Sequence, residues 1–179
     1  MTQKGITTSE HGDILADTTV MDWLDVGGGT HFKVLRLCEQ TGQWALYVHM
    51  APGARFQAHR HEGSGQFFVT KGELIYDAGR AKPGTYGFEP IFATHVDAHC
   101  VEETEMLFLG EGAVTYFKDD GSIDFVFNPR TLGDAFALQH MGRLLFPSSL
   151  PLASLKTVKP LKSVDLCGPC TPRHTQHTL

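Results

Sequence analysis

The sequence has no apolar run long enough to cross a bilayer, and residues 1–19, MTQKGITTSEHGDILADTT, lack the apolar block of a secretory signal peptide. Its formal net charge is −5, so it has no excess of basic residues for binding nucleic acid or an anionic membrane surface. The 179 residues include four scattered cysteines, too few for a disulfide scaffold. These absences predict a cytoplasmic protein that binds neither nucleic acid nor a membrane.

The chain does contain enough apolar material for one domain of ordinary size. Hydrophobic residues make up 41% and charged residues 20% of the sequence, a balance typical of globular proteins. Residues 1–29 begin polar and irregular and predict an N-terminal arm. Residues 30–146 predict a barrel with a packing helix, and residues 147–179, which are interrupted by prolines, predict a C-terminal tail.

Short segments rich in strand-forming residues run from about residue 31 to residue 127. THFKVLRLC and QWALYVHM, separated by the turn-like EQTG, predict a hairpin. Glycine, proline, aspartate and asparagine separate the later segments, which lie at 66–77, 84–90, 94–101, 106–117 and 122–127. This spacing predicts an all-β sandwich or barrel and not an alternating α/β fold. Apolar residues recur every three or four positions over 131–146 and predict a helix on the outside of the sheet.

The stretch PGARFQAHRHEG places His59 and His61 two residues apart in strand-like sequence. Residues i and i+2 of a strand point to the same face, so the two imidazoles would project together as half of a metal site. Two exposed loop histidines are the alternative interpretation of the pair alone. His95, after the proline turn in FEPIFATH, is a candidate third ligand. His99 would lie on the same strand face as His95 if the strand containing both residues is regular, although a lone strand histidine is more often a packing or surface residue.

These residues resemble the first cupin motif, in which a glycine precedes H-x-H by five residues and an acidic residue and a second glycine follow. Gly53, His59 and His61 match, and Gly72 matches the closing glycine to within one residue. The acidic position falls on Gln66 or Gly65, depending on the end from which it is counted. GTYGFEPIFATH resembles the second motif, with His95 as the matching ligand. The resemblance implies a double-sheet jelly-roll barrel with one or two C-terminal helices.

A narrower resemblance is carried by VGGGTHFKVLRL, MAPGARFQAHRH, YGFEPIFATH and FKDDGSI. These stretches are similar to small cupin dioxygenases that cleave diketones and hydroxyketones, such as the 2,4'-dihydroxyacetophenone dioxygenase and acetylacetone-cleaving enzymes. The family implies one non-haem Fe(II) ion, with His59, His61 and His95 as its catalytic ligands. Some members add a glutamate, for which Asp77 or Gln66 would be the candidate here; we expect a three-histidine site. Zinc or nickel is an alternative metal.

The resemblance implies cleavage of a carbon–carbon bond in a small-molecule substrate, with both atoms of O2 incorporated. Neutral imidazoles would leave the charge of Fe(II) largely uncompensated, so the ion could attract an enolate oxygen. Inward strand residues would form the pocket walls, and plain barrel core is the alternative role for each. The candidates are Trp44, Phe68, Phe108 and His99.

Two other functional classes stay open: a metal-dependent cupin isomerase, lyase or decarboxylase, and a non-catalytic cupin such as a small-molecule sensor or zinc-binding regulator. We expect a homodimer or homotetramer, because small cupins commonly pair through strand edges.

CGPC at 167–170 is not followed by the helix that a thioredoxin motif requires. Cys167 and Cys170 could bind zinc with His174 and His177, but the spacing is closer than usual and favours a plain tail.

Overall fold

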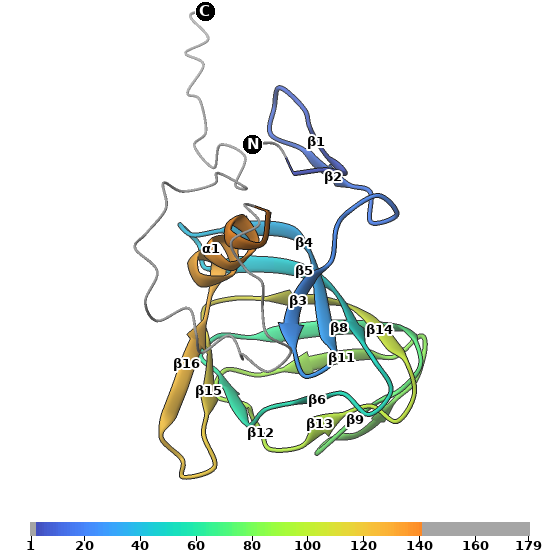
Figure 1. Cartoon of the computed structure of the whole chain (residues 1–179), viewed down its shortest axis with the longest axis vertical. Helices are drawn as coiled ribbons and strands as arrows, with labels where there is room; N and C mark the ends of the chain where they lie inside the picture. The colour runs from blue at the N-terminus through green and yellow to red at the C-terminus, as the bar shows by residue number, and fades with distance from the viewer. Residues whose placement is uncertain (1–2, 141–179) are drawn as a thin grey trace, which may run out of the picture.

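The structure is a computed structural model that describes residues 3–140. These residues form strands and one C-terminal helix, α1 (Figure 1). The elements are β1 (Ile6–Thr8), β2 (Ile14–Ala16), β3 (Leu24–Gly27), β4 (Thr30–Cys38), β5 (Gln43–Met50), β6 (Arg55–Phe56), β7 (His59–His61), β8 (Gly65–Lys71), β9 (Leu74–Tyr76), β10 (Gly79–Ala81), β11 (Tyr86–Glu89), β12 (Thr94–His95), β13 (Ala98–His99), β14 (Thr104–Gly110), β15 (Val114–Phe117), β16 (Ile123–Phe127) and α1 (Pro129–His140).

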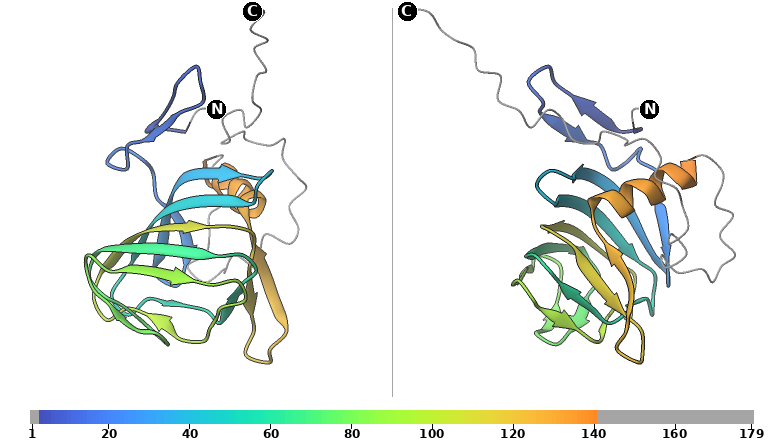
Figure 2. Two further views of the ribbon diagram at one scale, coloured as in Figure 1. Left: turned by 180° about the vertical axis from the view of Figure 1, so that it is seen from behind. Right: turned by 90° about the vertical axis from the view of Figure 1, so that its left-hand side faces the viewer.

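The strands build a jelly-roll barrel from one large sheet and two smaller ones. The large sheet has the order β11-β8-β14-β5-β4-β3, and the smaller sheets have the orders β12-β7-β15-β16 and β10-β9-β13-β6. All pairings between these strands are antiparallel. Figure 2 shows the large sheet curving over the smaller ones, with the β1–β2 hairpin standing apart from the barrel. The prediction of an all-β jelly-roll barrel is confirmed.

The β4–β5 hairpin confirms the alternation predicted for THFKVLRLC and QWALYVHM. Their residues pair in antiparallel register, with a shift between Val34 and Arg36, and buried residues alternate with less buried ones along β5. Trp44 belongs to the inward set: its ring stacks on Phe108 at 5.4 Å and meets Phe127 edge-on. Its indole N–H donates to the Gly112 carbonyl at 3.1 Å, which satisfies the one polar group of this buried side chain.

Helix α1 begins two residues before the predicted stretch, because Asn128 caps it. The Asn128 side-chain oxygen accepts hydrogen bonds from the backbone N–H groups of Arg130 and Thr131, both at 3.0 Å. Pro129 occupies the first helical position, where no N–H is needed. Leu132, Ala135, Phe136 and Leu138 are buried, and the helix contacts β4 and β16 (Figure 1).

Four segments differ from the sequence-based boundaries. The predicted strand 106–117 is divided into β14 and β15, which belong to different sheets. The predicted strand 66–77 is divided into β8 and β9 at Gly72, whose φ of 69° is readily adopted only by glycine. The predicted strand 94–101 is divided into β12 and β13, which belong to different sheets. Residues 24–27, placed in the arm by the sequence pattern, pair with β4 in the large sheet.

The tail with its CGPC sequence, His174 and His177 lies outside the described residues, as does the end of the predicted helix after residue 140. Within residues 3–140, no helix combines the length and apolarity needed to span a membrane.

Candidate metal centre

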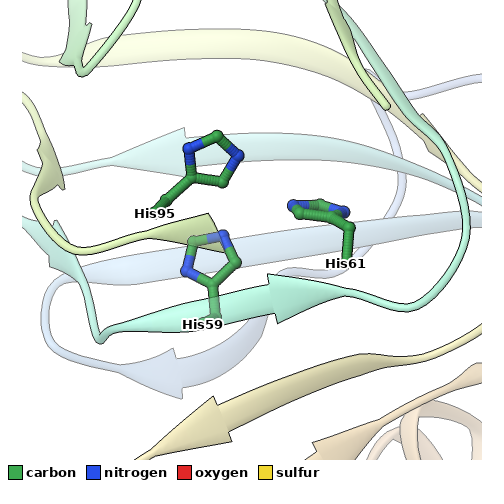
Figure 3. A group of neighbouring side chains, drawn as sticks. All are labelled: His59, His61 and His95. Carbon is green, nitrogen blue, oxygen red and sulfur yellow. The ribbon is translucent and has the colours of Figure 1, made fainter. Parts of the chain in front are cut away.

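His59, His61 and His95 converge inside the barrel. His59 and His61 come from the same face of β7, and β12 places His95 directly opposite His59 in the antiparallel pairing. One ring nitrogen from each histidine lies within 4.8 Å of the others, and all three side chains are buried. Figure 3 shows the rings of the two β7 residues and that of His95 gathered around a common space. The predicted trio is therefore brought together, with Arg60 turned the other way toward Glu62.

A tight turn joined to β7 fixes the position of His95. The N–H of Ala93 donates to the Pro90 carbonyl at 3.0 Å and closes the turn. The same turn is joined to His61 by two backbone hydrogen bonds: Phe92 N–H to the His61 carbonyl at 2.8 Å, and His61 N–H to the Ala93 carbonyl at 2.9 Å. The two histidine-bearing segments are thus held together by backbone contacts, which do not depend on any bound group.

The three imidazoles are held in the neutral form that a metal ligand requires. Burial lowers the pKa of His59 to about 4 and that of His61 to about 3, and it also lowers the pKa of His95. His59 Nδ1 lies 2.8 Å from the Gln57 carbonyl oxygen, so the protonated nitrogen is Nδ1 and the lone pair is on Nε2. Near neutral pH each ring therefore offers a lone pair without first losing a proton.

Glu89, which the sequence analysis did not identify, reaches the same space from the end of β11. Its side chain is only 6% exposed, and its Oε2 lies 3.1 Å from His61 Nε2. Its Oε1 lies 3.4 Å from His95 Nε2. Burial raises the pKa of Glu89 to about 7. A signal was present in the sequence YGFEP, because strand alternation puts Glu89 on the face opposite to the exposed Tyr86 and Phe88.

Several buried polar atoms at this point have no hydrogen-bond partner: His61 Nε2, both ring nitrogens of His95 and Oε2 of Glu89. Leaving such an atom unsatisfied costs roughly 1–3 kcal/mol, so a cluster of them is unusual in a folded interior. A divalent cation would satisfy the imidazole lone pairs and the carboxylate together. The residues fit a metal ion, and their nitrogen and oxygen donors suit iron, zinc or nickel without selecting one of them.

Aromatic rings pack around the three histidines. Phe108 stacks nearly parallel to His61, with ring centroids 6.1 Å apart, and Tyr116 stacks on His59 at 5.1 Å. Tyr76 packs edge-on against His95 at 5.5 Å. Of the predicted wall residues, Phe108 touches a histidine, and Trp44 lies behind Phe108. These rings limit the access of water to the site and lower the local dielectric constant.

Two predicted site residues on β8 point away from the centre. The inward positions of this strand are Gly65, Phe67 and Val69, which are buried. Gln66 therefore faces outward, where its Oε1 accepts a hydrogen bond from the Tyr86 hydroxyl at 3.0 Å. Phe68 is 43% exposed on the same outer face, so its prediction as an inward wall residue is wrong.

His99 and Asp77 also lie apart from the cluster. Because β12 and β13 are separate strands, His99 does not share a face with His95; it is half-buried, and its Nδ1 lies 3.2 Å from an Asp97 carboxylate oxygen. Asp77 is exposed in the turn between β9 and β10, and within residues 3–140 no hydrogen bond or ion pair joins its carboxylate to the three histidine rings. Burial lowers the pKa of His95, and the negative charge of Asp77 opposes part of this lowering.

Comparisons with known proteins agree with this fold. Residues 11–115, more than half of the chain, match the family described as the ChrR Cupin-like domain. The acetylacetone-cleaving enzyme of Acinetobacter johnsonii is 26% identical over 102 residues, which cover 54% of this chain and 67% of that enzyme.

Among solved structures, the chain is similar to a putative acetylacetone dioxygenase from Methylibium petroleiphilum PM1, with a TM-score of 0.61 and 28% identity over 65% of this chain and 88% of that one. Two further structures share the fold at lower identity. The acetylacetone dioxygenase of A. johnsonii has a TM-score of 0.59 and 20% identity, covering 76% and 88% of the two chains. A protein of unknown function with a cupin-like fold from Ralstonia eutropha JMP134 has a TM-score of 0.62 and 22% identity, covering 70% and 85%. With its jelly-roll barrel and buried histidine trio, this chain belongs to the ChrR cupin-like domain family of the cupins.

Proposed function

We propose that this protein is a non-haem Fe(II)-dependent dioxygenase that uses O2 to cleave a carbon–carbon bond of a diketone or hydroxyketone. The observation that carries the proposal is the trio of buried, neutral imidazoles inside the barrel, two of which, His61 and His95, have ring nitrogens without a hydrogen-bond partner. Its support from relatives is the 26% identity to an acetylacetone-cleaving enzyme over 102 residues. The substrate would be a small molecule that presents two oxygen atoms to one ion.

His59, His61 and His95 would hold the ion. When bound, Fe(II) would supply Lewis acidity toward an enolate oxygen and electrons for the reduction of O2. The chain contributes orientation: the Gln57 carbonyl fixes the His59 ring, and the turn at 90–93 fixes His95 relative to His61.

The surrounding side chains would govern what reaches the ion. Phe108, Tyr76 and Tyr116 are apolar surfaces against three different imidazoles, and they would exclude bulk water from the substrate. In a dry site of low dielectric constant, the attraction between a cation and an enolate oxygen is stronger than in water. This environment favours acidic diketones and hydroxyketones over neutral alcohols.

The experiment that tests the proposal is anaerobic loading with Fe(II), followed by oxygen-uptake measurements with a panel of diketones and hydroxyacetophenones. We expect O2 consumption that depends on both iron and substrate, with two carbonyl-containing fragments as products. The matched control is His99→Ala, which removes a histidine outside the cluster and should leave the activity in place. Tight iron binding without O2 consumption by any member of the panel would contradict the proposal.

A zinc-binding, non-catalytic cupin is the second candidate, because imidazole and carboxylate donors suit zinc as well as iron. The match to the ChrR Cupin-like domain does not by itself require catalysis. Zinc that is retained through purification, together with an absence of turnover after iron loading, would favour this candidate. Turnover of a substrate without O2 would instead favour a cupin isomerase, lyase or decarboxylase.

A further inference from the structure

We propose that Glu89 is a fourth ligand of the metal, and that it provides from β11 the carboxylate that the first cupin motif otherwise provides from β8. This inference rests on the proposed metal site, but not on the proposed dioxygenase reaction. Gly65, at one of the two positions to which that motif assigns its acid, is the direct partner of Glu89 in the antiparallel pairing of β8 with β11.

The two positions compete for one volume inside the barrel. A Cβ atom added to Gly65 would lie 2.8 Å from Glu89 Oε2 and 3.3 Å from His61 Cε1. The space into which a side chain at position 65 would grow is therefore the space that the Glu89 carboxylate fills. Glycine at this position has a specific consequence, since it lets a carboxylate from the neighbouring strand reach the histidines.

The distances from Glu89 match those of ligands that share an ion. Two donors at right angles, each roughly 2.1 Å from a metal, lie roughly 3.0 Å apart. The carboxylate is 3.1 Å from His61 Nε2 and 3.4 Å from His95 Nε2, and both of these nitrogens lack a hydrogen-bond partner. A carboxylate that only oriented a histidine would be expected to accept a well-aligned N–H bond, and the Oε2 atom of Glu89 accepts none.

The charges at the site point the same way. Within residues 3–140, the ion pairs of Glu89 are with His61 and His95 alone, and no lysine or arginine pairs with it. An ionised carboxylate this deeply buried needs a cationic partner, and a divalent ion between the imidazoles would be that partner. With Glu89 as a ligand, the charge of a divalent centre falls from two to one, so a singly charged enolate would neutralise it.

The test uses Co(II) as the probe, because its visible absorption reports the coordination number and its binding requires neither O2 nor a substrate. Affinity is measured by competition with a chelator in the wild type, in Glu89→Gln, and in Asp77→Asn, whose carboxylate is exposed. We expect a loss of about 100-fold or more in Glu89→Gln, at the upper end of what removal of a supporting group causes, and no more than about a threefold change in Asp77→Asn. The Co(II) absorption should also change in Glu89→Gln and not in Asp77→Asn.

A strand-exchange variant gives an independent measurement. The double variant Gly65→Glu with Glu89→Gly removes the carboxylate from β11 and returns one to β8. We expect it to bind Co(II) at least tenfold more tightly than Glu89→Gly alone. A crystal structure of the metal-loaded wild type should place a Glu89 oxygen about 2.0–2.2 Å from the ion.

Wild-type affinity in Glu89→Gln, or a loaded structure with the carboxylate beyond about 3 Å from the ion, would overturn the inference. Either result would leave the dioxygenase proposal intact. Conversely, Co(II) binding that depends on Glu89 in a protein that never consumes O2 would support the inference while the proposed reaction fails.

Discussion

The metal-free protein should lose stability in mild acid, because His59 and His61 must stay neutral in the folded chain. Burial lowers the pKa of His59 from 6.5 to about 4 and that of His61 from 6.5 to about 3. Between 6.5 and these values, the unfolded chain binds protons that the folded chain does not. The stability that these imidazoles contribute is therefore complete above pH 6.5 and is lost as the pH falls.

Glu89 opposes this effect. Burial raises its pKa from 4.5 to about 7, so between these values the folded chain holds a proton that the unfolded chain releases. A difference of one pKa unit between the folded and unfolded chains corresponds to about 1.36 kcal/mol of unfolding free energy. Lowering the pH to about 5 should therefore reduce the unfolding free energy by roughly 2 kcal/mol for each of the two histidines and raise it by roughly 2.5 kcal/mol through Glu89. The wild type should therefore be roughly 1–2 kcal/mol less stable at about pH 5 than at about pH 7.5, and Glu89→Gln should lose roughly 4 kcal/mol.

The assay is urea unfolding of chelator-treated protein across this pH range, followed by tryptophan fluorescence. His11→Gln is the matched control, because His11 is exposed and its replacement should leave the pH dependence unchanged. His61→Gln removes one of the two histidine contributions of roughly 2 kcal/mol, so it should abolish the loss or turn it into a small gain. The reasoning is refuted if the wild type and Glu89→Gln lose the same stability on acidification, because the buried carboxylate would then not be protonated in the folded chain.

Three further outcomes are expected. His61→Ala should remove most bound metal, since two remaining imidazoles form a weak site; full iron retention measured by elemental analysis would contradict this. Gly110→Ala should destabilise the fold by about 1–3 kcal/mol in urea unfolding, because the new methyl group would overlap the Trp44 ring, and a neutral effect would mean that this ring can move freely. Phe88→Glu should shift the expected dimer or tetramer toward monomer in analytical ultracentrifugation, because Phe88 is exposed on the edge strand β11; an unchanged sedimentation coefficient would place the interface elsewhere.

The elements that the sequence predicted correctly depend on local patterns. The β4–β5 hairpin shows strict alternation around a short turn, and the H-x-H pair needs only the two-residue period of a strand to place both rings on one face. His95 was found because a proline turn and a histidine are adjacent in the sequence. None of these inferences required knowledge of which strands pair.

The errors arose where local patterns were ambiguous. Phe67 and Phe68 are both apolar, so composition does not show which of them faces inward. Gly65, the preceding inward residue, has no side chain that would show which positions of the strand alternate inward. The structure shows that Phe67 is buried and Phe68 exposed, which also turns Gln66 outward. His99 was misplaced for a different reason: the break between β12 and β13 interrupts the alternation, and no glycine or proline in THVDAHCV marks it.

Glu89 was missed because its position depends on pairing between strands. The first motif places its acid along its own sequence, whereas Glu89 lies across the sheet from Gly65 and six residues before His95. The turn between Glu89 and His95 contains Phe92 at a φ of 67°, the one non-glycine residue with positive φ within residues 3–140. This conformation costs a non-glycine residue about 1–2 kcal/mol. A hydrogen bond offsets this cost: the Phe92 N–H donates to the His61 carbonyl and so holds the turn against β7, the strand that bears the other two histidines. The turn then keeps both the Glu89 carboxylate and the His95 imidazole facing His61. The second motif thereby holds Glu89 and His95 at one fixed spacing, facing the two histidines of the first motif.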